Sequence, residues 1–382
     1  MSPSELSILN TFDHRPTCAE VDLGILRQNL NAIRTFVSPS KIMAVVKANG
    51  YGHGLERTGL ALQQAGVDSL GVAYIEEAIA LRQSGVTIPI LVFGGLLQDQ
   101  LELYIKHDVD VTASSVGKLE QIEETARRLK RRARVHLKID TGLERIGVHY
   151  YSANTLFDAA LRVKHSDVVG VYSHFADVNL GDLKIAEVQL ERFLEALRYY
   201  EERANGPFLR HIASSSGLMA LKSSHLDMVR PGLVLYGVYP GEGYASILPV
   251  KPVLSLKSQV VYFKVAKKGA GVSYGHTWFA PEDTRIVTVP IGYGDGYLRA
   301  LSNKASVVVR GKKNPIVGVV CMDQLMVNLG PSGVGYNGDE VVLIGESEGE
   351  RISVEELAGL IGTTPHEILV SLNQRIPRVY RG

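Results

Sequence analysis

The sequence predicts an N-terminal (β/α)₈ barrel followed by a smaller, mostly β domain. From about residue 41 to residue 237, apolar runs typical of strands buried on both faces alternate with amphipathic segments. Eight such units in roughly 200 residues match the strand count and length of a (β/α)₈ barrel. After residue 240 the alternation gives way to β-branched runs separated by turn signals. An open, doubly wound sheet is the alternative, because alternation alone does not show that a sheet closes.

The elements follow from these runs in chain order. The predicted barrel strands lie at 41–47, 69–73, 89–95, 110–114, 134–140, 168–175, 209–215 and 229–237. The clearest amphipathic segments between them, at 55–66, 115–131 and 186–204, predict helices. A linker is expected at 240–245, then strands within 253–269, 284–294, 305–323 and 339–347 and a helix at 353–362. We therefore expect a barrel domain over 12–240 and a β domain over 241–382, with residues 1–11 associated with the latter.

Composition narrows the class of protein. The 382 residues carry 41 Lys and Arg against 40 Asp and Glu, a net charge of +1, which argues against a nucleic-acid binder. Two cysteines, Cys18 and Cys321, cannot build a disulfide framework, which favours a reducing compartment. The first 16 residues lack the apolar core of a signal peptide, and no apolar run reaches the ~18 residues of a membrane span. These observations predict a cytoplasmic protein.

Several polar side chains follow the predicted barrel strands, where barrel enzymes carry their active sites. Lys47 closes the first strand, Arg145 follows the fifth, His174 lies on the sixth and Arg230 begins the eighth. Ser214, Ser215 and Ser216 follow the seventh. Each residue alone is more often a solvated strand end or a hydrogen-bonded core residue. Cations meeting at one mouth would repel one another unless an anion lay among them, so together they indicate an anionic ligand.

Common nucleotide and metal motifs are missing from the sequence. The glycine-rich stretch KANGYGHG (47–54) does not match GxGxxG, and no GxxxxGK[ST] occurs. Neither HExxH nor paired CxxC is present, so the sequence predicts no metal site.

Seven blocks in order resemble the alanine racemases, a family of enzymes that use pyridoxal 5′-phosphate (PLP) and have fold type III. They are VVKANGYGHG (45–54), KIDTGLERIG (138–147), SHFA (173–176), RPGLVLYG (230–237), VSYGHTW (272–278), IGYGDGY (291–297) and CMDQLMVNLG (321–330). The resemblance runs from residue 15 to residue 381. It implies a homodimer that interconverts L- and D-alanine and supplies D-alanine for peptidoglycan.

The resemblance implies two catalytic bases and a substrate-carboxylate site. Lys47 matches the lysine that binds PLP covalently and then serves as one base, and Tyr274 of the second subunit matches the opposing base. Arg145 and the backbone around Met322 match the carboxylate site, with Met322 and Asp323 supplied by the partner subunit.

The cofactor site carries over in the same way. Arg230 matches the arginine that faces the pyridine nitrogen, with His174 and His211 in its supporting hydrogen-bond network. The residues implied on the phosphate are Tyr51, Ser215 and the backbone around Gly232.

Two further positions match the family and two depart from it. Tyr293 matches a tyrosine of the passage into the site, and Lys138 a position that is carbamylated in some members. Ser214 stands where the family often has Asn, which alters the phosphate pocket, and Gln374 where some members have a gate tyrosine, which alters the substrate entrance.

The chemistry of racemisation explains these residue types. A proton leaves one face of the amino acid and another returns to the opposite face, so two bases are needed while PLP accepts the electrons. Nearby arginines and burial should lower the lysine pKa from ~10.4 toward neutrality, and cationic neighbours such as His174 and Arg230 should lower that of the tyrosine from ~10. A guanidinium only donates hydrogen bonds, so a ring nitrogen facing Arg230 must accept and stay unprotonated. This weakens the electron sink and favours racemisation over transamination.

Three other functions are compatible with parts of the pattern. A racemase of the same fold acting on serine, lysine or several amino acids would share every catalytic group. PLP decarboxylases of the same barrel class fit the arginine and the C-terminal tyrosine block poorly. A non-catalytic PLP-binding protein would need Lys47 but neither Tyr274 nor the domain after residue 240.

Overall fold

The computed structural model describes residues 15–382, so the expectation for residues 1–11 lies outside the described residues. The chain forms two compact units. Leu26–Val250 make one unit, and residues 15–25 together with Lys251–Gly382 make the other. We describe each by itself.

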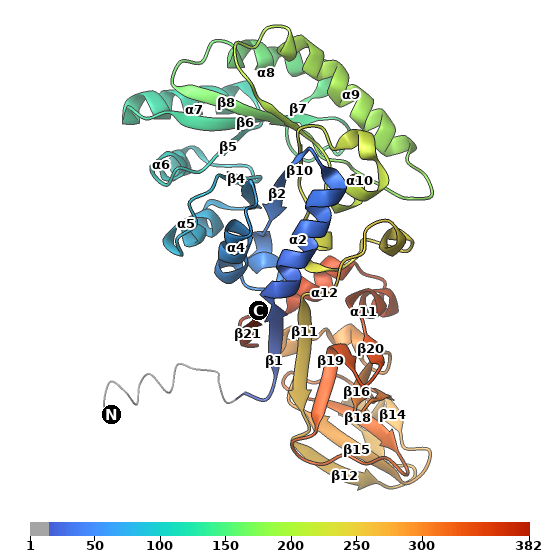
Figure 1. Cartoon of the computed structure of the whole chain (residues 1–382). Helices are drawn as coiled ribbons and strands as arrows, with labels where there is room; N and C mark the ends of the chain where they lie inside the picture. The colour runs from blue at the N-terminus through green and yellow to red at the C-terminus, as the bar shows by residue number, and fades with distance from the viewer. Residues whose placement is uncertain (1–14) are drawn as a thin grey trace, which may run out of the picture. The chain divides into compact units, whose positions relative to one another are not determined.

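The first unit is a barrel of parallel strands (Figure 1). Within the described residues, its eight strands are β2 (Lys41–Val45), β3 (Ser69–Val72), β4 (Ile90–Val92), β5 (Val111–Ala113), β6 (Ala133–Asp140), β8 (Ser166–Tyr172), β9 (Leu209–His211) and β10 (Met228–Val229). They pair in the orders β10-β2-β3-β4 and β5-β6-β8-β9, and the short β7 (Val148–His149) pairs with β6. Each predicted barrel strand thus overlaps an observed one.

Backbone hydrogen bonds join the two strand groups at both seams. Asp110 N donates to Ile90 O at 2.8 Å, which connects β4 to β5. Arg230 N donates to Ala213 O at 2.9 Å, which connects the segments that follow β10 and β9. The sheet therefore closes on itself, and the open doubly wound alternative is excluded.

Helices alternate with these strands, and Figure 1 shows α4 to α9 on the outside of the barrel. Their bounds are α2 (Leu23–Val37), α3 (Lys47–Tyr51), α4 (Leu55–Gln64), α5 (Ile75–Gln83), α6 (Leu101–Lys106), α7 (Val116–Leu129), α8 (Ala153–Ala160), α9 (Lys184–Glu201) and α10 (Ser215–Ala220). α7 shows why such segments form helices: Ser115 caps its first turn by accepting from Lys118 N, and its apolar face is buried.

The eighth predicted strand is wrong over most of its length. Only Met228–Val229 pair as β10, and Leu233–Tyr236 form a 3₁₀ helix, η5. The apolar run LVLY is fully buried in η5. A short buried apolar run is equally compatible with a strand, so its hydropathy did not distinguish a strand from a helical turn.

The second unit is mostly β. A seven-stranded sheet has the order β17-β16-β19-β11-β1-β21, with β20 beside β19, and a three-stranded sheet has the order β12-β15-β18. The strands are β1 (Cys18–Asp22), β11 (Leu254–Gln259), β12 (Tyr262–Ala266), β13 (Gly271–Val272), β14 (Trp278–Phe279), β15 (Thr284–Val289), β16 (Ser306–Val309), β17 (Lys312–Pro315), β18 (Leu325–Gly330), β19 (Glu340–Ser347), β20 (Glu350–Ile352) and β21 (Arg378–Arg381). Helices α11 (Val354–Ile361) and α12 (Pro365–Ser371) complete it.

Strand β1 differs from the predicted domain boundary. The sequence assigned residues from 12 onward to the barrel, but β1 lies between β11, to which it is antiparallel, and β21, to which it is parallel. Pairing on both edges satisfies its backbone groups inside the β unit. Because both partners come from the C-terminal part of the chain, no local pattern could reveal this placement.

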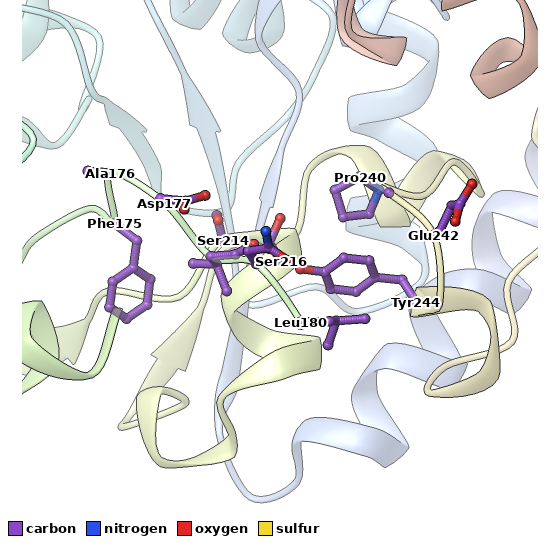
Figure 2. A pocket seen from close by; sticks show the side chains of 12 residues that line it. Phe175, Ala176, Asp177, Leu180, Ser214, Ser216, Pro240, Glu242 and Tyr244 are labelled. Carbon is purple, nitrogen blue, oxygen red and sulfur yellow. Dashed lines mark hydrogen bonds between the residues drawn. The ribbon is translucent and has the colours of Figure 1, made fainter. Parts of the chain in front are cut away.

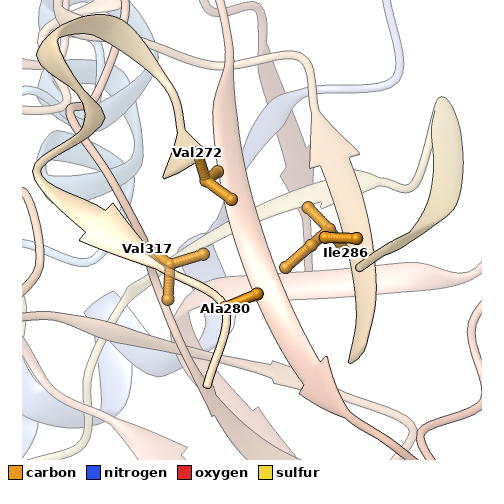
Figure 3. Close-up of a cluster of buried hydrophobic side chains, with 5 residues drawn as sticks. Val272, Ala280, Ile286 and Val317 are labelled. Atoms are coloured by element: carbon orange, nitrogen blue, oxygen red, sulfur yellow. The ribbon is translucent and has the colours of Figure 1, made fainter. Parts of the chain in front are cut away.

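A small apolar cluster fixes one hairpin of the β unit. Ala266, Val272, Ala280, Ile286 and Val317 pack together (Figure 3) and are all buried. Val272 and Ala280 flank the turn between β13 and β14, whereas Ile286 lies on β15. The cluster therefore anchors the turn over residues 273–277 by both of its ends.

None of the helices in the described part of the chain is both long enough and apolar enough to span a membrane.

Candidate active site

Lys47 stands at the start of an unusual turn. β2 ends at Val45, so the lysine lies just beyond the strand and opens α3 instead of closing β2 as the sequence predicted. Ala48, Asn49, Gly50 and Tyr51 then all have positive φ, between 52° and 61°. Such conformations cost about 1–3 kcal/mol each outside glycine and concentrate at functional sites. This strained turn lowers the stability of the fold but fixes the backbone direction at Lys47.

Glu77 holds this turn in place. Its Oε1 accepts from Ala48 N at 2.7 Å, while its Oε2 accepts from Ala73 N at 2.8 Å. One carboxylate on α5 thus ties the residue after Lys47 to the end of the neighbouring strand. A hydrogen bond to a charged group is worth about 1.5–3 kcal/mol, which offsets part of the strain.

Tyr51, Ser215 and Gly232 meet on the side of the barrel where η5 begins. Gly232 N and Val234 N donate to the Ser215 hydroxyl at 3.0 and 3.3 Å. A Cβ on residue 232 would lie 2.5 Å from the Tyr51 hydroxyl, so only glycine permits this approach. Two hydroxyls and two backbone N–H groups therefore share one small region, a donor set suited to an anion.

Arg230 lies buried directly after β10 and is held on several sides. Its Nη2 donates to Ser173 O at 2.7 Å, to Ile212 O at 2.9 Å and to His174 Nδ1 at 3.2 Å. Its Nη1 donates to His211 Nδ1 at 2.8 Å. Burial lowers the pKa of this guanidinium to about 10, which still leaves it charged at neutral pH. The three residues assigned together by resemblance are thus in direct contact.

The cations of the barrel lower one another's proton affinity. Burial, then the charge of Arg145 and also that of Arg230, lower the pKa of Lys47 although Glu77 opposes them. This confirms the predicted direction for Lys47. Lys138 is almost fully buried, its Nζ donates to Ile139 O at 2.8 Å, and burial lowers its pKa to about 7.

His174 differs from the expectation. Burial and the charges of Arg230 and Arg145 lower its pKa well below 6.5, so the imidazole is neutral at physiological pH. The prediction that His174 is a cation able to lower a tyrosine pKa is therefore wrong. Its position two residues beyond β8, against a buried guanidinium, is what removes the charge.

Arg145 is positioned by the loop that follows β6. Asp140 Oδ1 accepts from Gly142, Leu143 and Glu144 N at 2.8–3.2 Å, and its Oδ2 accepts from Arg145 N at 3.2 Å. Burial alone would raise the pKa of Asp140, but these backbone bonds hold it below its usual value. The ionised carboxylate shapes the loop, while the Arg145 side chain stays exposed.

The β unit brings its own predicted residues together. Tyr293 N donates to Cys321 O at 3.0 Å, Gly294 N donates to Met322 O at 2.8 Å, and Ser273 Oγ donates to Val319 O at 2.7 Å. The segments that carry Tyr274, Tyr293 and Met322 are therefore neighbours. These three side chains are 73%, 42% and 52% exposed. Asp323 Oδ1 accepts from Arg375 Nη2 at 2.7 Å.

A polar cavity of about 530 Å³ lies beside the serines of α10 (Figure 2). Ser214 and Ser216, on either side of Ser215 in the chain, line it together with Asp177, Glu242 and Tyr244. Ser214, the departure from the family pattern, thus faces this cavity, whereas Gln374 belongs to the other unit.

Comparison with known proteins decides the family. Residues 21–240 match the model of the alanine racemase N-terminal domain, and residues 253–380 match that of the C-terminal domain. The chain belongs to the alanine racemase family. It is 42% identical to an alanine racemase of Symbiobacterium thermophilum over 96% of this chain and 98% of that protein. It is 40% identical to alanine racemase 2 of Caldanaerobacter subterraneus subsp. tengcongensis over 97% and 96%.

Solved alanine racemase structures share the fold at full length. The enzyme of Streptomyces lavendulae matches with a TM-score of 0.92 and 36% identity, covering 96% of this chain and 97% of that one. The Bacillus anthracis alanine racemase with bound L-Ala-P matches with a TM-score of 0.89 and 34% identity, covering 97% and 96%.

Some residues of this racemase-family site were not predicted from the sequence. Glu77 was not singled out, because its role depends on contacts with two other elements. His136 and Asp110, which continue the hydrogen bonds behind His211, were not singled out. His136 has a visible signal, because it lies two residues before Lys138 on the same strand and so points to the same face.

Proposed function

We propose that this protein is a PLP-dependent alanine racemase that interconverts L- and D-alanine and supplies D-alanine for peptidoglycan in a reducing cytoplasm. The observation that carries the proposal is the barrel cluster itself. Lys47, with a lowered pKa, lies among the cations Arg145 and Arg230, and a separate set of hydroxyl and N–H donors meets at Ser215 and Gly232.

The residues of the barrel fit PLP. The close approach of Gly232 to the Tyr51 hydroxyl and the donors around Ser215 suit a phosphate. Arg230 offers only donors, which suits an unprotonated ring nitrogen. Lys47 is half-buried with a lowered pKa, as a lysine that binds a carbonyl group requires. When bound, PLP would draw electrons away from the α-carbon of the amino acid so that its proton can leave.

Lys47 serves as the base on one face. Because burial and nearby guanidinium groups lower its pKa, a larger share of its amine is neutral near pH 7 than in an exposed lysine. The Glu77-bound turn fixes the position from which this amine takes or returns a proton. Arg145 orients the substrate through its carboxylate, so that the α-carbon faces the base.

Tyr274 of a second subunit serves as the base on the opposite face. Its 73% exposure, together with that of Met322 and Tyr293, suits side chains that meet another chain. We therefore propose a homodimer with shared active sites, in which Met322 and Asp323 of the partner subunit complete the carboxylate site and Tyr293 lines the passage into it.

One experiment tests activity and substrate range together. The purified protein with added PLP is incubated with L-alanine, L-serine and L-lysine, and the enantiomers are separated by chiral chromatography. We expect D-alanine to form fastest. Faster conversion of serine or lysine would replace alanine as the substrate, and no conversion of any amino acid would contradict the proposed function.

A further inference from the structure

A line of buried polar side chains continues behind Arg230. Its Nη1 donates to His211 Nδ1 at 2.8 Å. His211 Nε2 lies 3.0 Å from His136 Nδ1, and His136 Nε2 lies 3.3 Å from Asp110 Oδ2. All four side chains belong to residues that are at most 3% exposed. The line crosses the barrel interior and ends outside at Arg134, whose Nε donates to Asp110 Oδ1 at 2.7 Å.

The two ends of the line fix the direction of every hydrogen bond in it. A guanidinium only donates, so His211 Nδ1 accepts, and the proton of this neutral imidazole is on Nε2. That proton is donated to His136 Nδ1, which leaves the His136 proton on Nε2, facing Asp110. An ionised carboxylate only accepts, so it requires the same direction from the other end. Neither imidazole can reverse or gain a second proton without placing two N–H groups against each other.

The surroundings keep His211 and Asp110 in the required ionisation states. Burial lowers the pKa of His211 well below 6.5, so its imidazole is neutral. Burial alone would raise the pKa of Asp110, but hydrogen bonds from His136 and Arg134 hold it below its usual value. The barrel also makes room for the line, because a Cβ on residue 170 would lie 2.2 Å from His136 Nδ1, so only glycine fits there.

The line supplies a counter-charge that Arg230 otherwise lacks. The hydrogen-bond acceptors around this guanidinium in the described structure are backbone carbonyls and imidazoles, all neutral. The neighbouring groups Lys138, Lys47 and Arg145 are basic, and the carboxylates beside them, Glu77 and Asp140, accept from backbone N–H groups. Asp110 is the carboxylate at the end of the hydrogen-bonded line. A buried charge without compensation is costly, so this distant carboxylate stabilises the guanidinium through two polarised imidazoles.

We propose that Asp110 is a positioning residue that, through His136 and His211, fixes the proton on each imidazole and keeps Arg230 a partly neutralised, donor-only group. The proposal rests on the proposed function in one respect, because the group that Arg230 would face is the ring nitrogen of PLP. In Asp110→Asn the amide can donate or accept, and the counter-charge is gone. Arg230 then becomes a stronger donor, which moves the ring nitrogen toward its protonated state.

The test begins with the histidine protons. In the holoenzyme labelled with ¹⁵N-histidine, nitrogen shifts distinguish protonated from unprotonated ring nitrogens, and His136→Gln and His211→Gln assign the signals. We expect both histidines neutral with the proton on Nε2. A proton on Nδ1 of either histidine, or a doubly protonated ring, would overturn the proposal. This readout does not need racemase activity, so it tests the hydrogen-bond directions in the line even if the proposed function fails.

Variants then test what the line does. With ¹⁵N-labelled PLP, the ring-nitrogen shift of Asp110→Asn should move toward the protonated value, kcat should fall about tenfold, and KM should stay within about twofold. Arg134→Gln removes the outer ion pair but keeps the carboxylate, and Asp110→Glu restores the carboxylate, so both should resemble the wild type in nitrogen shift. Equal effects of Asp110→Asn and Arg134→Gln, or an unmoved nitrogen shift in Asp110→Asn, would show that Asp110 only stabilises the fold.

Discussion

The two units present their predicted site residues in opposite ways. In the barrel, Arg230, His211 and Ser215 are buried. Arg230 donates to His211, and Ser215 accepts from Gly232 N. In the β unit, Tyr274 and Met322 are 73% and 52% exposed, although hydrogen bonds organise the backbone beneath them. The difference fits our proposal that one chain arranges the barrel half of the site by itself. In that proposal the exposed half in the β unit meets a second chain.

The largest effect should come from the barrel half. Lys47→Ala removes both the covalent attachment and one base, so racemisation should fall by about 10⁴-fold or more. Borohydride reduction and peptide mapping of the wild type should find PLP on Lys47. Lys41→Ala, at the exposed start of the same strand, is the control and should keep normal activity. Cofactor found on another lysine would contradict the assignment.

Tyr274→Phe tests the exposed half and should act on one face only. Proton exchange with deuterated solvent should fall by about 10²–10⁴-fold for one alanine enantiomer, while exchange through Lys47 on the other survives in part. Tyr262→Phe, another exposed tyrosine of the β unit, should leave both rates unchanged. Equal loss for both enantiomers with PLP still bound would argue against two separate bases.

Arg230→Glu sharpens the comparison inside the barrel, because it replaces a donor-only group by an acceptor. The ring nitrogen should become protonated, so racemisation should fall while transamination to pyruvate rises. Arg230→Lys keeps a charged donor and should show no rise in transamination. An Arg230→Glu enzyme with an unchanged racemisation rate and no pyruvate formation would contradict the proposal that Arg230 keeps the ring nitrogen unprotonated.

Lys138 gives a smaller effect, on stability. Its pKa falls from 10.5 to about 7 on folding, so between these pH values the unfolded chain binds more protons than the folded one. Stability should therefore rise with pH across this window, by up to about 1.4 kcal/mol per pH unit. Lys138→Met lacks this dependence, so its advantage over the wild type should shrink from pH 7.5 to pH 9.5. Urea unfolding of both apoproteins at one fixed concentration measures it, and an advantage that stays constant with pH would contradict the lowered pKa.

The sequence predicted the barrel well because its signals are local. Each buried strand is a short apolar run, and the polar residues that follow these runs meet at one end of the barrel. What it missed depends on contacts distant in the chain. The pairing of β1 with β21, the contact of Glu77 with Ala48 and the neutral state of His174 all require positions known only from the fold. For residues 233–236, burial was predicted correctly but the conformation was not.

The central claim, that each active site combines a barrel from one chain with a β unit from another, has a direct test. Lys47→Ala and Tyr274→Phe should each be nearly inactive alone. Refolded together, half of the dimers should be mixed, and each mixed dimer should carry one site with both defects and one intact site. Random pairing therefore predicts the return of about a quarter of wild-type activity. Mixed dimers confirmed by mass spectrometry but still inactive would contradict the account, because lysine and tyrosine would then come from the same chain.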